Sequence, residues 1–405
     1  MSQELLRRLG LGAVARRQGP ERLAFSLFLL GCAVIPGIGV ANVVLGACLV
    51  TTLWWRFTAR RAGEPFLGPF ARTTPLHGPW GAYVALYVAS AAFSTLPSRT
   101  LLEMKGLGTY LLLFFAMALL QDGDDVDLLL DLLRITTIYL VFRGLGQWVL
   151  GWNNLDKRVT GGLSTYMTYT GVLMVFGLLL LARALDSSRP RAGRLLDASA
   201  AALAVVATVL TFTRSAYLGF AAGALALLGV KRPKFLVALP VAVLLAFVLA
   251  PASVQIRAIS SFDPSDPSTR DRVSMWKSGL AMVADRPIFG VGPKRTKVIY
   301  PVYRRPEAIE QAPGHLHNNM LQVAAQSGLP ALTAYLVFCG VFLREAWRRT
   351  RGGPSASVSA GSLAAFVALF AAGLFEFNFG DVEVLMSLLV ACALPFVGTT
   401  RIRPS

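Results

Sequence analysis

Apolar residues follow one another in long uninterrupted blocks along this chain. Leu112–Leu120, Leu173–Leu181 and Val237–Leu249 contain no charged residue and do not alternate with polar positions. Blocks of about 18–20 apolar residues have the length at which an α-helix, rising about 1.5 Å per residue, crosses roughly 30 Å of hydrocarbon. A membrane β-barrel would require alternation instead. The pattern therefore predicts an all-α polytopic membrane protein.

About twelve transmembrane helices and one long connecting loop are expected from the hydropathy. The predicted spans lie near residues 23–39, 41–56, 79–97, 101–120, 126–150, 166–183, 196–211, 214–230, 234–250, 317–343, 361–377 and 381–398. They divide the chain into a cytoplasmic amphipathic N-terminus at 1–22, spans one to nine within 23–250, a periplasmic loop domain with helices at 251–316, spans ten to twelve within 317–398, and a cytoplasmic tail at 399–405.

The composition agrees with a membrane protein. Of the 405 residues 55% are hydrophobic and only 15% are charged, which excludes a soluble enzyme. The net charge of +17 would indicate a nucleic-acid partner in a soluble protein. Here, however, more than half of the 39 basic residues fall in segments that lie on the same side of the membrane if each predicted span crosses it once. The positive-inside rule therefore predicts that both termini are cytoplasmic, and no nucleic-acid partner is expected.

The loop at residues 251–316 is the exception to this charge distribution. It faces outward in the predicted topology, yet it is rich in arginine and lysine, which long translocated loops tolerate but do not require. These charges either solvate an extracytoplasmic cap or serve a functional site. The loop is therefore the first place to look for function.

A helix is predicted at the centre of this loop. Ser268-Thr269-Arg270-Asp271 has the form of a helix start, and the run ends before Pro287. Arg270 and Arg272 would lie in or near the first turn, where free backbone N–H groups and the helix dipole favour a phosphate. Trp276, four residues after Arg272, would add an aromatic surface for a sugar. The alternative is an amphipathic helix on the membrane with Trp276 as an interfacial anchor.

Two of the three histidines stand at the end of the loop, in Gly314-His315-Leu316-His317-Asn318-Asn319. A histidine at the outer mouth of a span can remove a proton from a hydroxyl group if a neighbour fixes its tautomer, and Asn318 or Asn319 could do so. A metal site is less favoured, because any further ligands would have to be distant carboxylates. The remaining alternative is a polar interfacial histidine.

Further charged residues are predicted near the same surface. Arg214 follows a break between two spans, and a half-buried charge there is costly unless an anion meets it. Snorkelling to lipid headgroups is the alternative. Arg158 is expected at the same level, and Arg143, inside a span, either pairs with a carboxylate or joins the anion site. The acids Glu376, Asp381 and Glu383 at the last outward turn are expected to neutralise loop arginines rather than to act in catalysis.

Several kinds of chemistry are not expected. The four cysteines, Cys32, Cys48, Cys339 and Cys392, lie within apolar spans and are interpreted as packing residues. The chain has no phosphate-binding loop of the Walker type, and Gly290-Val291-Gly292 lacks the setting of a dinucleotide fingerprint. No metal, nucleotide or other cofactor is therefore expected.

Taken together, four motifs resemble the O-antigen ligase and polymerase superfamily of bacterial envelope enzymes. They are Thr213-Arg214-Ser215 at a span junction, Arg272-Val273-Ser274-Met275-Trp276 in the loop helix, Asp285-Arg286-Pro287-Ile288-Phe289-Gly290-Val291-Gly292 after it, and His317-Asn318-Asn319-Met320-Leu321-Gln322 followed by Gly328-Leu329-Pro330. The resemblance spans residues 130–395. His315 and the pair Lys294-Arg295 depart from the family's pattern.

The resemblance implies a GT-C-like glycosyltransferase that acts at the periplasmic face of the inner membrane. An O-antigen ligase transfers the glycan from undecaprenyl diphosphate to the lipid A–core oligosaccharide, with membrane lipids around it and no cofactor. In that scheme Arg214 and Arg272 would hold the diphosphate and His317 would be the base. Secondary contacts would come from Arg158, Arg270, Arg143, Trp276, His315 and Asn318.

Two other functions are compatible with the sequence. A polymerase of the same superfamily uses the same donor but often has two sizeable periplasmic loops, whereas only one loop here exceeds about twenty residues, so a ligase is favoured. A transporter or flippase would suit the intramembrane Arg143. Its charges would be expected near the bilayer midplane, however, and here they gather at one mouth.

Overall fold

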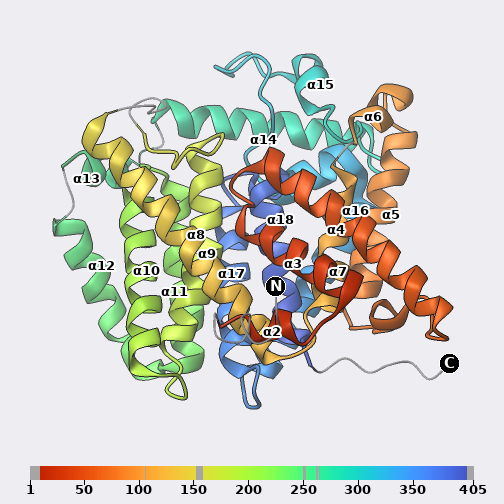
Figure 1. Ribbon diagram of the computed structural model, residues 1–405. Helices are drawn as coiled ribbons and strands as arrows, with labels where there is room; N and C mark the ends of the chain where they lie inside the picture. Colours follow the sequence, from red (N-terminus) through yellow and green to blue (C-terminus); the bar gives the residue numbers. More distant parts are fainter. Residues whose placement is uncertain are drawn as a thin grey trace.

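The computed structural model describes residues 10–104, 106–151, 158–249, 252–260, 263 and 265–398. This part of the chain consists of helices and connecting segments and contains no strand (Figure 1). The first helices are α2 (Gly12–Ala15), α3 (Gly19–Ala33), α4 (Ile38–Arg61), α5 (His77–Ala92), α6 (Pro97–Glu103), α7 (Leu112–Leu119) and α8 (Gly123–Leu150). They are followed by α9 (Tyr166–Ala184), α10 (Arg191–Val209), α11 (Arg214–Lys231), α12 (Ala238–Leu249), α13 (Ala252–Ile259), α14 (Pro267–Asp285), α15 (Thr296–Tyr303), α16 (Asn319–Arg349), α17 (Ala356–Ala372) and α18 (Val382–Ala393).

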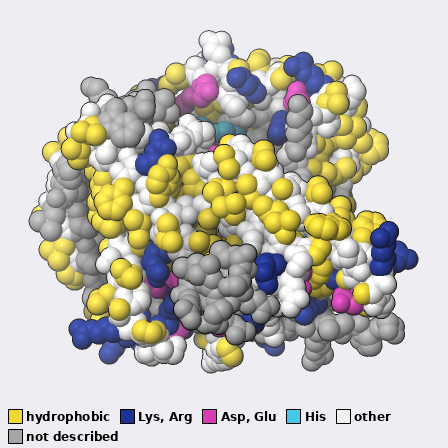
Figure 2. Space-filling model, viewed as in Figure 1, with side chains coloured by type: hydrophobic (Ala, Val, Ile, Leu, Met, Phe, Trp, Pro, Cys, Tyr) yellow, Lys and Arg dark blue, Asp and Glu magenta, His cyan; other side chains and the backbone are white. Residues whose placement is uncertain are grey.

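The prediction of an all-α protein with several apolar helices is confirmed. Four described helices are long and apolar enough to cross a membrane, namely α4, α9, α10 and α16, and a fifth span results if the bent pair α6–α7 is counted as one. Each of the twelve predicted spans overlaps a helix, but the number of crossings stays a prediction. Figure 2 shows a broad band of hydrophobic side chains with Lys and Arg gathered towards its upper and lower rims, as expected for a multi-pass membrane protein.

One predicted span is broken. Residues 101–120 were expected to form a single helix, but Pro97–Glu103 and Leu107–Leu119 meet at an angle of 59°. Gly106 lies at the break, and Gly108 lies in the first turn of the segment that follows it. Glycine weakens a continuous helix because it loses the most backbone entropy on folding, so two glycines close together favour a bend at this point.

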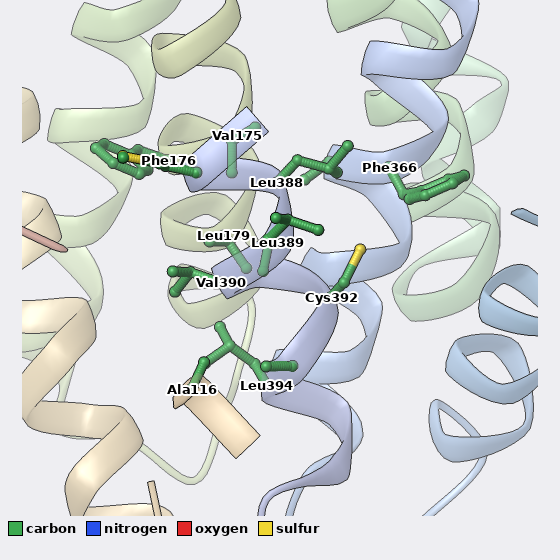
Figure 3. Packing of buried hydrophobic residues seen from close by; sticks show 14 of the residues in the cluster. Ala116, Val175, Phe176, Leu179, Phe366, Leu388, Leu389, Val390, Cys392 and Leu394 are labelled. Atoms are coloured by element: carbon green, nitrogen blue, oxygen red, sulfur yellow. The ribbon is translucent and has the colours of Figure 1, made fainter. Parts of the chain in front are cut away.

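Helix α9 forms the centre of the bundle. In its most apolar window 89% of the residues are buried, and α10, α17, α11 and α18 pack around it. Figure 3 shows Val175, Phe176 and Leu179 of α9 beside the apolar side chains of α18. Small residues allow close backbone approach: a Cβ atom on Gly219 or Gly223 of α11 would lie 2.8 Å from a backbone carbonyl oxygen of α17.

The basic residues near the N-terminus are engaged with acids of α8. Arg17, only 6% exposed, donates to Asp125 Oδ2 at 2.6 Å, and Arg16 contacts Asp124 at 2.7 Å. Arg16 and Arg17 belong to the stretch predicted as a cytoplasmic amphipathic N-terminus, and this placement stays a prediction. The buried Asp125 carboxylate binds the Arg17 guanidinium. The first nine residues of the predicted amphipathic stretch lie outside the described residues.

Helix α14 lies across the upper end of the bundle, with α15 above it (Figure 1). The predicted helix in the loop exists, but its predicted start at Ser268 is wrong by two residues. Asp266 caps the helix by accepting a hydrogen bond from the Thr269 backbone, and Pro267 occupies the first position. A proline there loses no hydrogen bond and is pre-set for helix, which fixes the earlier start. Arg272 therefore lies in the second turn and not the first.

The segment that follows α14 packs against an interruption in α16. Gly328 has φ 84° and ψ 170°, so the helix is interrupted there and the carbonyls of Ala325 and Gln326 become available. They accept hydrogen bonds from the backbones of Val291, at 2.9 Å, and Gly292, at 3.0 Å. A Cβ atom on Gly328 would lie 1.9 Å from the Ile288 carbonyl oxygen. The Gly290-Val291-Gly292 motif is therefore a backbone docking element and not a nucleotide site.

Replacing Gly328 with alanine is expected to destabilise the protein by at least about 3 kcal/mol. Two effects contribute. The alanine would be strained in a backbone conformation that only glycine adopts readily, and its Cβ atom would overlap with the docked segment and push it away. Thermal unfolding in detergent, followed by size-exclusion chromatography, measures the effect. Gly340→Ala in the same helix is the matched control, since a Cβ atom there meets nothing within 4 Å. Equal melting temperatures for the two variants would contradict the docking argument.

Candidate active site

A cavity of about 230 Å³ opens between α14, the start of α11, the start of α9 and the segment before α16. It brings together four of the residues that the sequence singled out from widely separated positions: Arg158, Arg214, Arg272 and His317. The other lining residues are Tyr166, Met167, Phe212, Thr213, Ser215, Ser268, Asp271, Met275 and Glu310. Three guanidinium groups and one imidazole thus face a single space.

Arg214 is held at the first position of α11. Its Nη2 donates to Asp266 Oδ2 at 2.9 Å and its Nη1 to the Ser260 carbonyl at 3.3 Å. Both side chains of the ion pair are only 13% exposed. The Nε atom is buried and has no hydrogen-bond partner among the described residues. Arg214 is thus ordered by its carboxylate partner at the wall of the cavity.

Arg158 is fixed from two sides. Its guanidinium lies 3.3 Å from the centre of the Tyr166 ring, and its Nε donates to the Thr211 carbonyl at 2.5 Å. Thr211 belongs to the tight turn between α10 and α11, in which Phe212 has a positive φ of 54°. Such a conformation is strained in a bulky residue. The turn places Arg158 and Arg214 side by side at the cavity wall.

His317 pairs with a buried glutamate. Its Nδ1 lies 3.2 Å from Glu376 Oε2, and Glu376 is 5% exposed. A carboxylate at Nδ1 holds the ring with its proton on that nitrogen, which leaves Nε2 as the proton acceptor. His317 also has φ 49°, a rare conformation for a residue other than glycine. The arrangement is that of a base oriented by an acid.

The expectation that Asn318 or Asn319 orients the histidine is wrong. Asn318 caps α16 by accepting from the Leu321 backbone at 2.9 Å, and its Nδ2 donates to the Leu374 carbonyl. Asn319 donates to Asn378 at 2.7 Å. Both amides therefore bind the start of α16 to the turn between α17 and α18. Their effect on His317 is indirect, because this turn carries Glu376.

Glu376 also connects the second histidine and an arginine. Its carboxylate lies 3.7 Å from His315 Nε2 and 3.8 Å from Arg272 Nη2. The expectation that an acid of this turn neutralises a loop arginine is therefore confirmed for Glu376 and Arg272. Burial lowers the pKa of His315 to about 4, while the Glu376 charge opposes that shift, so the His315 ring is neutral at pH 7.

Besides His315 and Asn318, three further candidate residues are not part of the cavity wall. Arg270 is exposed on α14, because the helical period turns it away from Arg272. Arg143 donates to the Tyr139 hydroxyl at 3.0 Å and packs on Gly162. Trp276 is near Phe375, with ring centres 6.2 Å apart. None of the three is among the residues that line this cavity in the described part of the chain.

Sequence reasoning missed two residues that shape the site. Asp266 holds Arg214, and Gln322 fixes the backbone ahead of His317: its Oε1 accepts from the Leu316 backbone at 2.8 Å, and its Nε2 donates to Thr296 at 2.7 Å. The sequence held two signals for Gln322, because it ends the motif that begins at His317 and is a polar residue in the buried half of an apolar helix. Such a residue requires a hydrogen-bond partner.

Residues 199–336 match the family model described as O-Antigen ligase. The match supports membership of the O-antigen ligase and polymerase superfamily. No curated protein matches the chain. The superfamily implies a glycosyltransferase-like enzyme that acts on lipid-linked glycans and substrates related to the lipid A–core.

The match to the superfamily covers only part of the cavity. Arg214, Arg272 and His317 lie within residues 199–336. Arg158 precedes the matched region and Glu376 follows it. The carboxylate partner of the imidazole is therefore supplied by a segment outside the region that matches the ligase model, and only the folded chain brings the two together.

Two further cavities share part of their lining. One, of about 100 Å³, is lined by Tyr83, Tyr87, Tyr110 and Phe377, and the other, of about 440 Å³, runs past Leu45 and Leu49 of α4 and Met386 of α18. Both are also lined by Lys294, Gly106, Thr109 and Val382. Phe377 directly follows Glu376, and its ring centre lies 5.9 Å from that of His315.

The histidines and Glu376 are also the residues that could hold a metal ion. One ligand atom from each of His315, His317 and Glu376 lies within 4.8 Å of the other two. A carboxylate that is distant in the sequence therefore lies beside both histidines in the folded chain.

Proposed function

We propose that the protein is an O-antigen ligase that transfers a glycan from undecaprenyl diphosphate to the lipid A–core oligosaccharide. The reaction is an inverting glycosyl transfer without a metal or nucleotide, at the periplasmic face of the bacterial inner membrane. Both termini are cytoplasmic in this proposal. The observation that carries it is the single cavity lined by Arg158, Arg214, Arg272 and His317.

In the proposed reaction the arginines act on the donor. Guanidinium groups match phosphate oxygens, and Arg158 and Arg214 come from different helical junctions, so they can contact the diphosphate from different directions. Their charge stabilises the diphosphate as the glycosidic C–O bond breaks and negative charge accumulates on the leaving oxygen. Arg272, which Glu376 orients, contributes a third positive charge.

The imidazole acts on the acceptor. His317 Nε2 takes the proton of an acceptor hydroxyl while that oxygen attacks the anomeric carbon, and undecaprenyl diphosphate departs on the opposite side. The Glu376 carboxylate stabilises the imidazolium that forms, because it accepts the Nδ1 proton at 3.2 Å. Attack opposite to the leaving group inverts the anomeric centre.

The cavities that share Lys294 support an acceptor that approaches from the Phe377 side. Aromatic side chains suit the faces of sugar rings, apolar helix surfaces suit acyl chains, and the Lys294 ammonium suits a phosphate between them. The donor diphosphate would then lie on the arginine side of the Glu376 turn and the acceptor sugar on the other. Each substrate would reach His317 from its own side.

Arg214→Lys is expected to lower the rate of transfer by at least about tenfold. An ammonium group cannot reproduce the bidentate contact, and it cannot hold Asp266 while presenting a second N–H to the diphosphate. Initial rates with purified protein and lipid-linked donor measure the loss. Arg270→Lys, an exposed position on α14, is the matched control. Near-normal turnover of the Arg214 variant would show that this residue contacts headgroups instead.

The proposed function is tested by transfer in detergent with purified protein, lipid-linked donor and lipid A–core acceptor. Product formed without an ion gradient or ATP is expected, and it would exclude a transporter. A deletion strain separates ligase from polymerase. Polymer that still accumulates on undecaprenyl diphosphate, without long glycan on lipid A, is expected for a ligase. Single repeats on lipid A would instead identify a polymerase.

A further inference from the structure

The two histidines and the glutamate have the geometry of a three-ligand metal site. In a tetrahedral zinc site, metal–ligand distances of about 2.0–2.2 Å place the ligand atoms about 3.3–3.6 Å apart. His317 Nδ1 lies 3.2 Å from Glu376 Oε2, and His315 Nε2 lies 3.7 Å from Glu376 Oε1. One ligand atom from each of the three residues lies within 4.8 Å of the other two. The three side chains surround one space, and they would move closer together to bind a single ion.

Burial and access also suit an ion. Glu376 is buried, whereas the His315 and His317 side chains are 31% and 17% exposed, so an ion can enter from the surface. Two imidazoles and one carboxylate leave a fourth position for water, as in open zinc sites. The ligand set favours zinc and its neighbours over magnesium or calcium, which prefer oxygen ligands. Arg272, 3.8 Å from Glu376, opposes a cation and would have to move aside.

We propose that His315, His317 and Glu376 bind a transition-metal ion such as Zn²⁺, and that this ion switches off the base. The ion displaces the proton from His317 Nδ1 into the solvent. The imidazole then takes up a proton from the solvent on Nε2, which becomes its single proton. Nε2 becomes a donor and can no longer accept the hydroxyl proton. The ion also withdraws Glu376 from Arg272. The inhibition rests on the proposed function, but the metal site does not.

Binding is tested first, without reference to activity. Protein purified with a tag that contains no histidine is titrated against a fluorescent zinc chelator. One Zn²⁺ per chain is expected, with affinity lowered at least about tenfold in His315→Ala and in His315→Gln, and with no competition from Mg²⁺. His77→Ala is the matched control: it is the third histidine of the chain, and its Nδ1 contacts Thr74 at 3.0 Å. Equal affinity in wild type and both His315 variants would overturn the site.

Inhibition is tested second, in the transfer assay. Activity is expected to fall in proportion to zinc occupancy and to return on addition of EDTA. Undiminished transfer by protein whose site is filled would overturn the switch and leave the metal site standing. Histidine-dependent zinc binding by a protein that never transfers glycan would overturn the proposed function together with the switch, again leaving the site. Transfer by a protein that binds no zinc would overturn the site and the switch, and it would leave the proposed function standing.

Discussion

Replacing His317 with alanine is expected to lower the rate of glycan transfer by about 10²–10⁴-fold, the usual contribution of a general base. His317 is the imidazole on the wall of the arginine cavity, and the carboxylate at its Nδ1 leaves Nε2 available for a proton. The measurement is the initial rate of product formation with saturating donor and acceptor. Donor binding, measured separately, is expected to change little, because the arginines remain in place.

Two further variants test whether the loss of activity comes from the loss of the base. His77→Ala removes a histidine on α5 whose ring contacts Thr74, and it is expected to retain wild-type activity. His317→Gln keeps a polar side chain of similar reach but cannot accept and carry a proton, so it is expected to be as inactive as the alanine variant. An alanine variant that retained more than about a tenth of the activity would argue against His317 as the base.

Replacing Glu376 with glutamine is expected to lower transfer by about 10²–10⁴-fold although the side chain keeps its shape. A glutamine amide can donate to His317 Nδ1, which would place the ring proton on Nε2 and remove the acceptor. The substitution also leaves Arg272 without its carboxylate at 3.8 Å. The reaction rate is compared with that of Glu376→Asp, which keeps the charge on a shorter side chain.

The informative result is which of the two Glu376 variants retains more activity. If charge and tautomer matter, Glu376→Asp is expected to retain more activity than Glu376→Gln. A melting temperature for each variant separates this effect from instability, because the turn is held by Asn318 and Asn319 independently of Glu376. Equal and high activity in both variants would mean that Glu376 has no positioning role and that the tautomer of His317 is set in another way.

The sequence predicted the class of the protein and four of the residues that line the cavity. A helix surrounded by hydrocarbon needs apolar side chains along its whole length. Long apolar blocks therefore identify membrane helices, however these helices pack against one another. Arg158, Arg214, Arg272 and His317 could be selected because a charge or an imidazole at the end of an apolar helix is costly without a purpose. The motifs in residues 199–336 agreed with the family match.

Only the tertiary structure decided which of these residues act together. Glu376 is 59 residues from His317, and Asp266 is 52 residues from Arg214, so neither pairing follows from helical spacing. The periodicity of a helix shows which of its residues share a face, and Arg270 and Arg272 diverge for that reason. Which face meets which neighbour depends on how whole helices pack, through close contacts such as those at Gly219 and Gly328. That packing depends on contacts among many side chains that are far apart in the sequence, so no local sequence pattern predicts it.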